Sequence, residues 1–150
     1  MKLASALSER ADLQARLSQL ETRLNNNAKV QEGQQPAEDP SVLLAELDTL
    51  LGRLEELTAR INLTNSCTEK DGRTVTELIA RRDMLKQRLS VLRSFLNAAS
   101  QKVDRYARSE IVIKSTVNVA ELQKKTDAAA KELRETDEII QELNWTTELK

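Results

Sequence analysis

The feature that most constrains the fold is a leucine repeat that runs through three stretches of the chain. Leucine and other aliphatic side chains recur three or four residues apart in residues 3–24, 43–61 and 78–96. This spacing places them on one face of a helix, and that face must be buried against another element. With only three glycines and two prolines in 150 residues, few points force a helix to end. The sequence predicts an all-α fold, an elongated antiparallel bundle of about four long helices.

Capping and turn residues place the first two helices. The first is predicted over residues 3–30, and a polar loop follows it. Asp39 is a favourable N-cap residue, and Pro40 suits the first helical position of the second helix, which is expected to run to about Thr64.

The later helices have similar start signals. A loop over residues 66–73, with a turn at Asp71-Gly72, is expected before a third helix over residues 74–100. A fourth helix is predicted to start at Asn118, with Glu121 completing a capping box.

Residues 101–118 lack the helical period. The segment Ile111-Val112-Ile113 is β-branched, which favours extended backbone. A lone strand has no partner inside a helical bundle, so an extended arm that crosses to another subunit is predicted. Residues 1–150 are otherwise expected to form a single domain.

A monomer of such length and thinness would expose apolar stripes to water. The predicted partner is therefore a second copy of the chain, in a homo-oligomer that is a dimer or a ring of dimers.

Charge and composition exclude several functions. Successive segments alternate in net charge, at +2 for residues 1–31, −5 for 32–66, +5 for 67–118 and −3 for 119–150. This alternation favours helices that complement one another, and no nucleic acid is expected, since few aromatic residues are present to stack on bases. The chain has no histidine, which excludes Ser-His-Asp and Cys-His catalysis and histidine-based metal sites. No catalytic residue, metal or cofactor is predicted.

The expected location is the cytoplasm. The single cysteine, Cys67, allows no internal disulfide, and the apolar start of the chain is too short for a signal peptide. Amphipathic helices permit a membrane partner, but polar faces of mixed charge disfavour it.

Two arginines occupy leucine positions in the helical repeats. Arg10 and Arg82 would need a carboxylate partner if buried, and Asp12, Asp48 or Asp83 can supply one. The sequence favours ion pairs that fix the helix register, and it leaves open a polar pocket for a small anion.

Other polar residues are candidates for an interface or a binding site. Asparagines at a helix end favour capping, the polar arm favours attachment to a neighbouring subunit, and the tryptophan near the end favours anchoring against another helix. A ligand site remains the alternative for the asparagines and the arm. The candidates are Asn62, Asn65, Asp104, Arg105, Tyr106, Arg108, Glu110, Asn144 and Trp145.

Several short polar motifs, spread over nearly the whole chain, carry a resemblance. They are Val30-Gln31-Glu32-Gly33, Glu38-Asp39-Pro40, Ile61-Asn62, Thr64-Asn65, Asp104-Arg105-Tyr106, Arg108-Ser109-Glu110-Ile111 and Asn144-Trp145-Thr146-Thr147-Glu148-Leu149. On these residues the chain resembles the septicolysin-like proteins, a bacterial family of unknown function. The resemblance implies an all-helical, oligomeric protein with no established activity, and the family name implies a cytolysin.

Three functions are compatible with these patterns. The favoured hypothesis is a non-catalytic, self-associating helical scaffold or interaction protein. The alternatives are a pore-forming toxin and an enzyme or small-anion binder with its site at a subunit interface.

Overall fold

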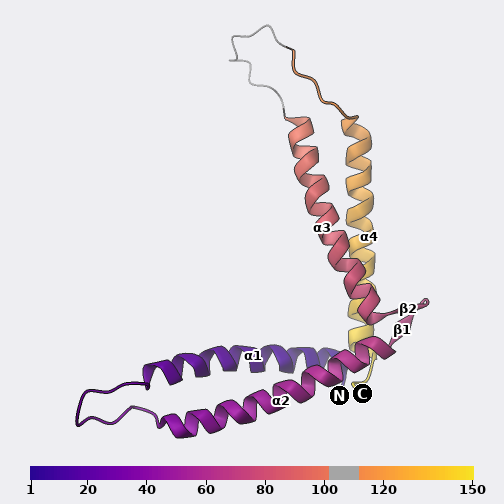
Figure 1. Ribbon diagram of the computed structural model, residues 1–150. Helices are drawn as coiled ribbons and strands as arrows, with labels where there is room; N and C mark the ends of the chain where they lie inside the picture. Colours follow the sequence, from indigo (N-terminus) through magenta and orange to yellow (C-terminus); the bar gives the residue numbers. More distant parts are fainter. Residues whose placement is uncertain (102–111) are drawn as a thin grey trace. The chain divides into compact units, whose positions relative to one another are not determined.

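The structure is a computed structural model that describes residues 1–101 and 112–150. The long helices are α1 (Leu3–Asn26), α2 (Pro40–Cys67), α3 (Val75–Ser100) and α4 (Val119–Thr146), and a hairpin of β1 (Glu69–Lys70) and β2 (Arg73–Thr74) lies between α2 and α3 (Figure 1). The prediction of an all-α helical bundle is confirmed. The described residues form two compact units, one of Met1–Val75 with Leu143–Lys150 and the other of Thr76–Glu142. One domain over residues 1–150 stays a prediction.

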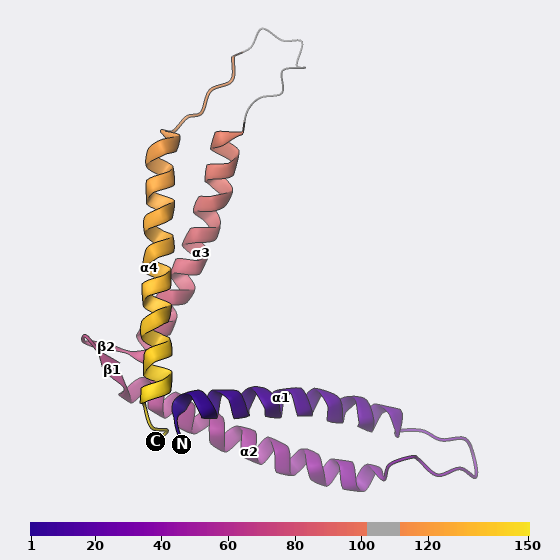
Figure 2. The same cartoon turned by 180° about the vertical axis from the view of Figure 1, so that it is seen from behind.

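The first unit is built on α1 and α2, which lie side by side and antiparallel (Figures 1 and 2). Their buried side chains recur every seven residues, as the leucine repeat predicts. At one end of the pair, residues from both helices share a core cluster with Leu149. The seven-residue series are Ala6, Leu13 and Leu20 on α1, and Leu43, Leu50 and Leu57 on α2.

Local hydrogen bonds decide where α1 ends and α2 begins. Asn27 ends α1 four residues earlier than predicted, because its side-chain amide donates to the Arg23 carbonyl at 2.8 Å and its Oδ1 accepts from the Glu38 amide at 2.9 Å. The Asp39 cap is confirmed, since its carboxylate accepts from the Ser41 amide at 2.8 Å. At its other end α2 continues to Cys67, three residues beyond the prediction.

A β-hairpin replaces the loop predicted between α2 and α3. The turn at Asp71-Gly72 is confirmed, and both residues have positive φ, at 53° and 76°. Two consecutive residues of positive φ form the turn that matches the twist of antiparallel strands. The flanking residues consequently pair, Glu69 with Thr74 and Lys70 with Arg73, so a loop without strands was the wrong expectation.

The second unit pairs α3 with α4, which lie side by side in both views (Figures 1 and 2). The Asn118 start of α4 is confirmed, since its Oδ1 accepts from the Glu121 amide at 3.2 Å. Residues 101 and 112–118 are neither helix nor strand, and residues 102–111 of the arm lie outside the described residues. The α3 face that the leucine repeat predicts is confirmed by its burial, at Leu78, Leu85 and Leu89. The buried side chains of α4 also follow helical spacing, at Leu122, Thr126, Ala129, Thr136 and Ile140.

Candidate interaction surfaces

Arg82 forms the expected ion pair at the edge of the α3–α4 contact. Its side chain is 23% exposed, and its Nε and Nη2 lie 3.0 and 2.9 Å from Oδ1 of Asp83. Asp137 of α4, which the sequence analysis did not propose, lies 3.9 Å from Nη1. Two carboxylates around one guanidinium more than balance its single positive charge, so this cluster is poorly suited to bind a further anion.

Arg10 does not form the predicted ion pair. It is half-buried on α1 and makes no hydrogen bond or ion pair with another described residue. Asp12 and Asp48 are exposed and bind neither Arg10 nor Arg82. The physical reason is that a long arginine stem can cover apolar surface while its head group stays in water, so no carboxylate is required.

A series of ion pairs joins α1 to α2 beside their core. Glu9 binds Arg53 at 2.7 Å, while Arg16 and Arg23 bind Glu46 at 3.8 and 3.3 Å. The α1 members are seven residues apart, as are Glu46 and Arg53, so the same period that buries leucines brings these charges together. The sequence analysis missed this series, although its seven-residue spacing was a usable signal.

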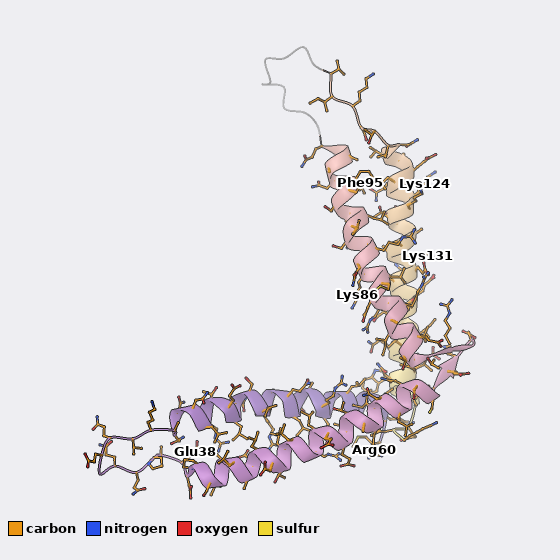
Figure 3. All side chains as sticks on the ribbon, in the orientation of Figure 1. Glu38, Arg60, Lys86, Phe95, Lys124 and Lys131 are labelled. Carbon is orange, nitrogen blue, oxygen red and sulfur yellow. The ribbon has the colours of Figure 1, made fainter. Side chains whose placement is uncertain are left out.

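The loop between α1 and α2 is held by a bidentate ion pair. Arg23 donates from Nε to both Glu38 carboxylate oxygens, at 3.2 and 3.1 Å, and from Nη2 to Oε1 at 2.6 Å. The guanidinium lowers the pKa of Glu38 and the carboxylate raises the pKa of Arg23, mainly through these hydrogen bonds. Figure 3 shows Glu38 near the loop end of α2.

The two ends of the sequence meet in what we call the terminal junction, residues 1–3 and 147–150. The Leu3 amide donates to the Thr147 carbonyl at 2.9 Å, and the Leu149 amide donates to the Met1 carbonyl at 2.8 Å. Lys2 binds the Glu148 carboxylate at 2.7 Å, and hydrogen bonds from Lys2 and the terminal ammonium lower the pKa of Glu148.

Asn144 and Trp145 precede this junction and differ in burial. Asn144 is buried, whereas Trp145 is 66% exposed. The tryptophan therefore does not anchor against another helix within the described chain, because it is turned about 100° around α4 from the buried Asn144.

The α2 asparagines do not act as caps in the described part of the chain. Asn62 is exposed and Asn65 is half-buried, and neither forms a hydrogen bond with another described residue. Asn62 lies instead at a shallow groove of about 550 Å³ along α2, together with Leu51, Leu54, Glu55, Thr58 and Ala59. The arm candidates lie outside the described residues; they are Asp104, Arg105, Tyr106, Arg108 and Glu110.

Large exposed apolar side chains lie near the end of α3 and in the described part of the arm that follows it. Phe95 and Ile113 are 45% and 66% exposed and line one cleft of about 240 Å³. Val112, which precedes Ile113 in sequence, is 76% exposed. The cleft wall is completed by Ala98, Ala99, Gln101, Lys114, Ser115 and Thr116.

Neither a metal cluster nor a membrane-spanning helix is found among the described residues. They contain no group of three or more His, Cys, Asp or Glu side chains that would hold a metal ion. Among them, no helix has the length and apolar character needed to cross a membrane. Cys67 is exposed at the end of α2, where the Ser66 hydroxyl lies 3.8 Å from its sulfur.

Comparisons with known proteins correct the predicted relationship. A family model described as a family of unknown function, DUF6847, matches residues 10–149. A crystal structure of a functionally unknown conserved protein from Corynebacterium diphtheriae is similar at 44% identity and a TM-score of 0.90, over 100% of this chain and 99% of that one. A comparison with curated proteins finds no match. The resemblance to septicolysin-like proteins is therefore wrong: short polar motifs were assigned to the wrong family.

Proposed function

We propose that this chain, which belongs to the family of unknown function DUF6847, is a non-catalytic helical scaffold that binds a second copy of itself. The observation that carries the proposal is the exposed apolar patch formed by Phe95 and Ile113, which line one cleft and are 45% and 66% exposed. Burying large apolar side chains of this kind contributes roughly 1.5–3 kcal/mol each, which favours association. Phe95 precedes the segment of residues 101–118 for which an intersubunit arm is predicted, and Ile113 lies within that segment.

The state of the carboxyl groups supports a structural role. Glu9, Glu38 and Glu148 have lowered pKa values because each accepts hydrogen bonds from a cation. Asp39 has a lowered pKa because it accepts hydrogen bonds from the hydroxyl and the amide of Ser41. A general acid at neutral pH needs a raised pKa instead. These carboxylates are ionised and take part in ion pairs and a helix cap, and a non-catalytic scaffold requires no other role of them.

The experiment measures absolute mass by light scattering after size-exclusion chromatography, over a range of protein concentrations. The wild-type chain is expected to run as a discrete oligomer. Phe95→Ser and Ile113→Ser are expected to lower the mass towards that of one chain, because each places a hydroxyl where an apolar contact is needed. Replacing residues 101–118 with a Gly-Ser linker of equal length tests the arm in the same way.

Trp145→Ser is the matched control, since this residue is as exposed as Ile113 but lies in the other unit. It is expected to leave the mass unchanged, and circular dichroism should show unchanged helix content for every variant. A wild-type chain that stays monomeric up to about 100 μM would overturn the proposal, because a dissociation constant above that concentration is weak for a specific assembly.

A further inference from the structure

A second apolar stripe runs along α2, away from the face that packs on α1. Leu44 and Leu51 are exposed, and Asp48 lies between them. Their spacing of four and three residues puts all three on one helix face. The buried residues Leu43 and Leu50 each precede a stripe leucine by one position, so the stripe is turned about 100° from the core. The α2 groove begins at Leu51.

A stripe of the same spacing runs along α3. Met84 and Val91 are exposed, at 56% and 68%, and Arg88 lies between them. Phe95 continues this face one turn further and joins it to the apolar patch of the proposed function. Figure 3 locates Phe95 near the end of α3.

The two stripes carry opposite charges at equivalent places. Asp48 follows Leu44 by four residues, just as Arg88 follows Met84, and neither charged group makes a hydrogen bond or ion pair with another described residue. Glu55, one turn beyond Leu51, adds a second exposed carboxylate to the α2 stripe. The α2 stripe is therefore acidic and the α3 stripe basic.

The other two helices do not share this character. Within α1 no large hydrophobic side chain is exposed, and within α4 Trp145 alone is. Large exposed apolar side chains in the described helices are thus concentrated on α2 and α3, which suits an interface restricted to these two elements.

We infer that the α2 stripe of one copy packs against the α3 stripe of a second copy, with Asp48 opposite Arg88. The inference rests on the proposed self-association and names the surface that completes it. If α3 packed against α3 of the second copy, the two Arg88 side chains would approach each other. If α2 packed against α2, the two Asp48 side chains would do so. Repulsion between like charges disfavours both arrangements. On each helix the charged residue lies between two apolar residues. Asp48 and Arg88 can therefore face each other whether the two helices pack parallel or antiparallel.

The arrangement is self-complementary. In a two-fold dimer, each copy contributes one α2 stripe and one α3 stripe, and the same contact forms twice. Each of the two contacts buries leucines of one copy against Met84 and Val91 of the other.

Charge reversal tests the pair. Asp48→Arg places two arginines at each contact, and Arg88→Asp places two aspartates there. Each variant alone is expected to weaken self-association at least about tenfold, measured by light scattering as a function of concentration. An equimolar mixture of the two is expected to recover the wild-type mass, since every contact then holds one arginine and one aspartate.

Two reversals off the stripes serve as controls. Asp12→Arg on α1 and Lys124→Asp on α4 change exposed charges to the same extent and are expected to leave the mass unchanged. A wild-type monomer would overturn the proposed function. A wild-type oligomer that Ile113→Ser disrupts but the Asp48 and Arg88 reversals do not would overturn this inference alone, as would single variants that stay dissociated when mixed.

Discussion

The hydroxyl of Thr64 accepts a hydrogen bond from the backbone amide of Lys150 at 3.0 Å, across 86 positions of sequence. The same hydroxyl donates to the Arg60 carbonyl at 2.8 Å, and the Arg60 guanidinium donates to the Lys150 carbonyl at 2.7 Å. These hydrogen bonds and the burial of Leu149 hold residues 149–150 against α2. The first unit is therefore assembled from both ends of the sequence.

Thr64→Val removes both hydrogen bonds of this hydroxyl with almost no change in shape. The loss is expected to lower the free energy of unfolding by about 1–2 kcal/mol, because the Lys150 amide loses its acceptor. Urea unfolding measures the stability, and faster hydrogen exchange of the Lys150 amide would locate the effect. Thr49→Val is the control: its exposed hydroxyl bonds only to Ala45 within α2, and its removal should change stability by less than about 0.5 kcal/mol.

Leu57→Ala tests the core of the first unit. Leu57 is fully buried in the cluster that includes Leu3 and Ile61. The truncation is expected to cost about 2–5 kcal/mol, from lost burial and from the cavity it leaves. Leu63→Ala, at an exposed position of the same helix, should change the unfolding free energy by less than about 0.5 kcal/mol. Equal effects of the two changes would contradict the assigned core.

Acid is expected to weaken the first unit. The pKa values of Glu9 and Glu38 lie below the ordinary value of 4.5 in the folded state, because Arg53 and Arg23 stabilise the charged carboxylates. The unfolded chain consequently binds protons more readily, so this stabilisation is present above pH 4.5 and is lost as the pH falls through the folded values. Thermal melts between pH 7 and pH 3 measure the effect.

Glu38→Gln provides the comparison for this pH dependence. The neutral amide cannot form the charged pair with Arg23, so the variant should be less stable than wild type at pH 7 and should lose less stability on acidification. Parallel pH profiles for the two proteins would show that Glu38 does not contribute. Glu21→Gln, an exposed change on α1, controls for the altered net charge.

Two glycines are expected to respond in opposite directions to alanine. Gly52 lies within α2, and a Cβ there would meet nothing within 4 Å, so Gly52→Ala should stabilise the helix by about 0.5–1 kcal/mol. Gly72 has a φ of 76° in the hairpin turn, where a Cβ is strained, so Gly72→Ala should destabilise by roughly 1 kcal/mol. Thermal unfolding of the two variants would show whether each substitution raises or lowers the stability.

The positions of the helices and their buried faces followed from local sequence. Periodicity identified the buried leucines of α1 and α2, and Asp39 and Asn118 marked helix starts, because capping depends on residues only two or three positions away. The hairpin shows the limit of this approach. Its turn was readable at Asp71-Gly72, but strands of two residues are too short to show a pattern.

The candidate residues were harder to predict than the helices. Asp83 was one of three aspartates proposed as partners of Arg10 and Arg82, and it does bind Arg82, its neighbour in sequence. Asp137 was not proposed, because it comes close to Arg82 only where α4 packs beside α3. Arg10 was expected to need a carboxylate, but it is only half-buried, and a partly exposed arginine can keep its charge in water.

The sequence alone determined where helices form, which of their faces are buried and which catalytic chemistries are excluded, since periodicity, caps and residue inventory are local properties. Only the tertiary structure decided that Leu149 completes the α1–α2 core, that Glu38 closes the loop onto Arg23, and that Trp145 is exposed. Those outcomes depend on side chains that meet across tens of residues. The free energy of such contacts is set by packing in three dimensions, which no local pattern encodes.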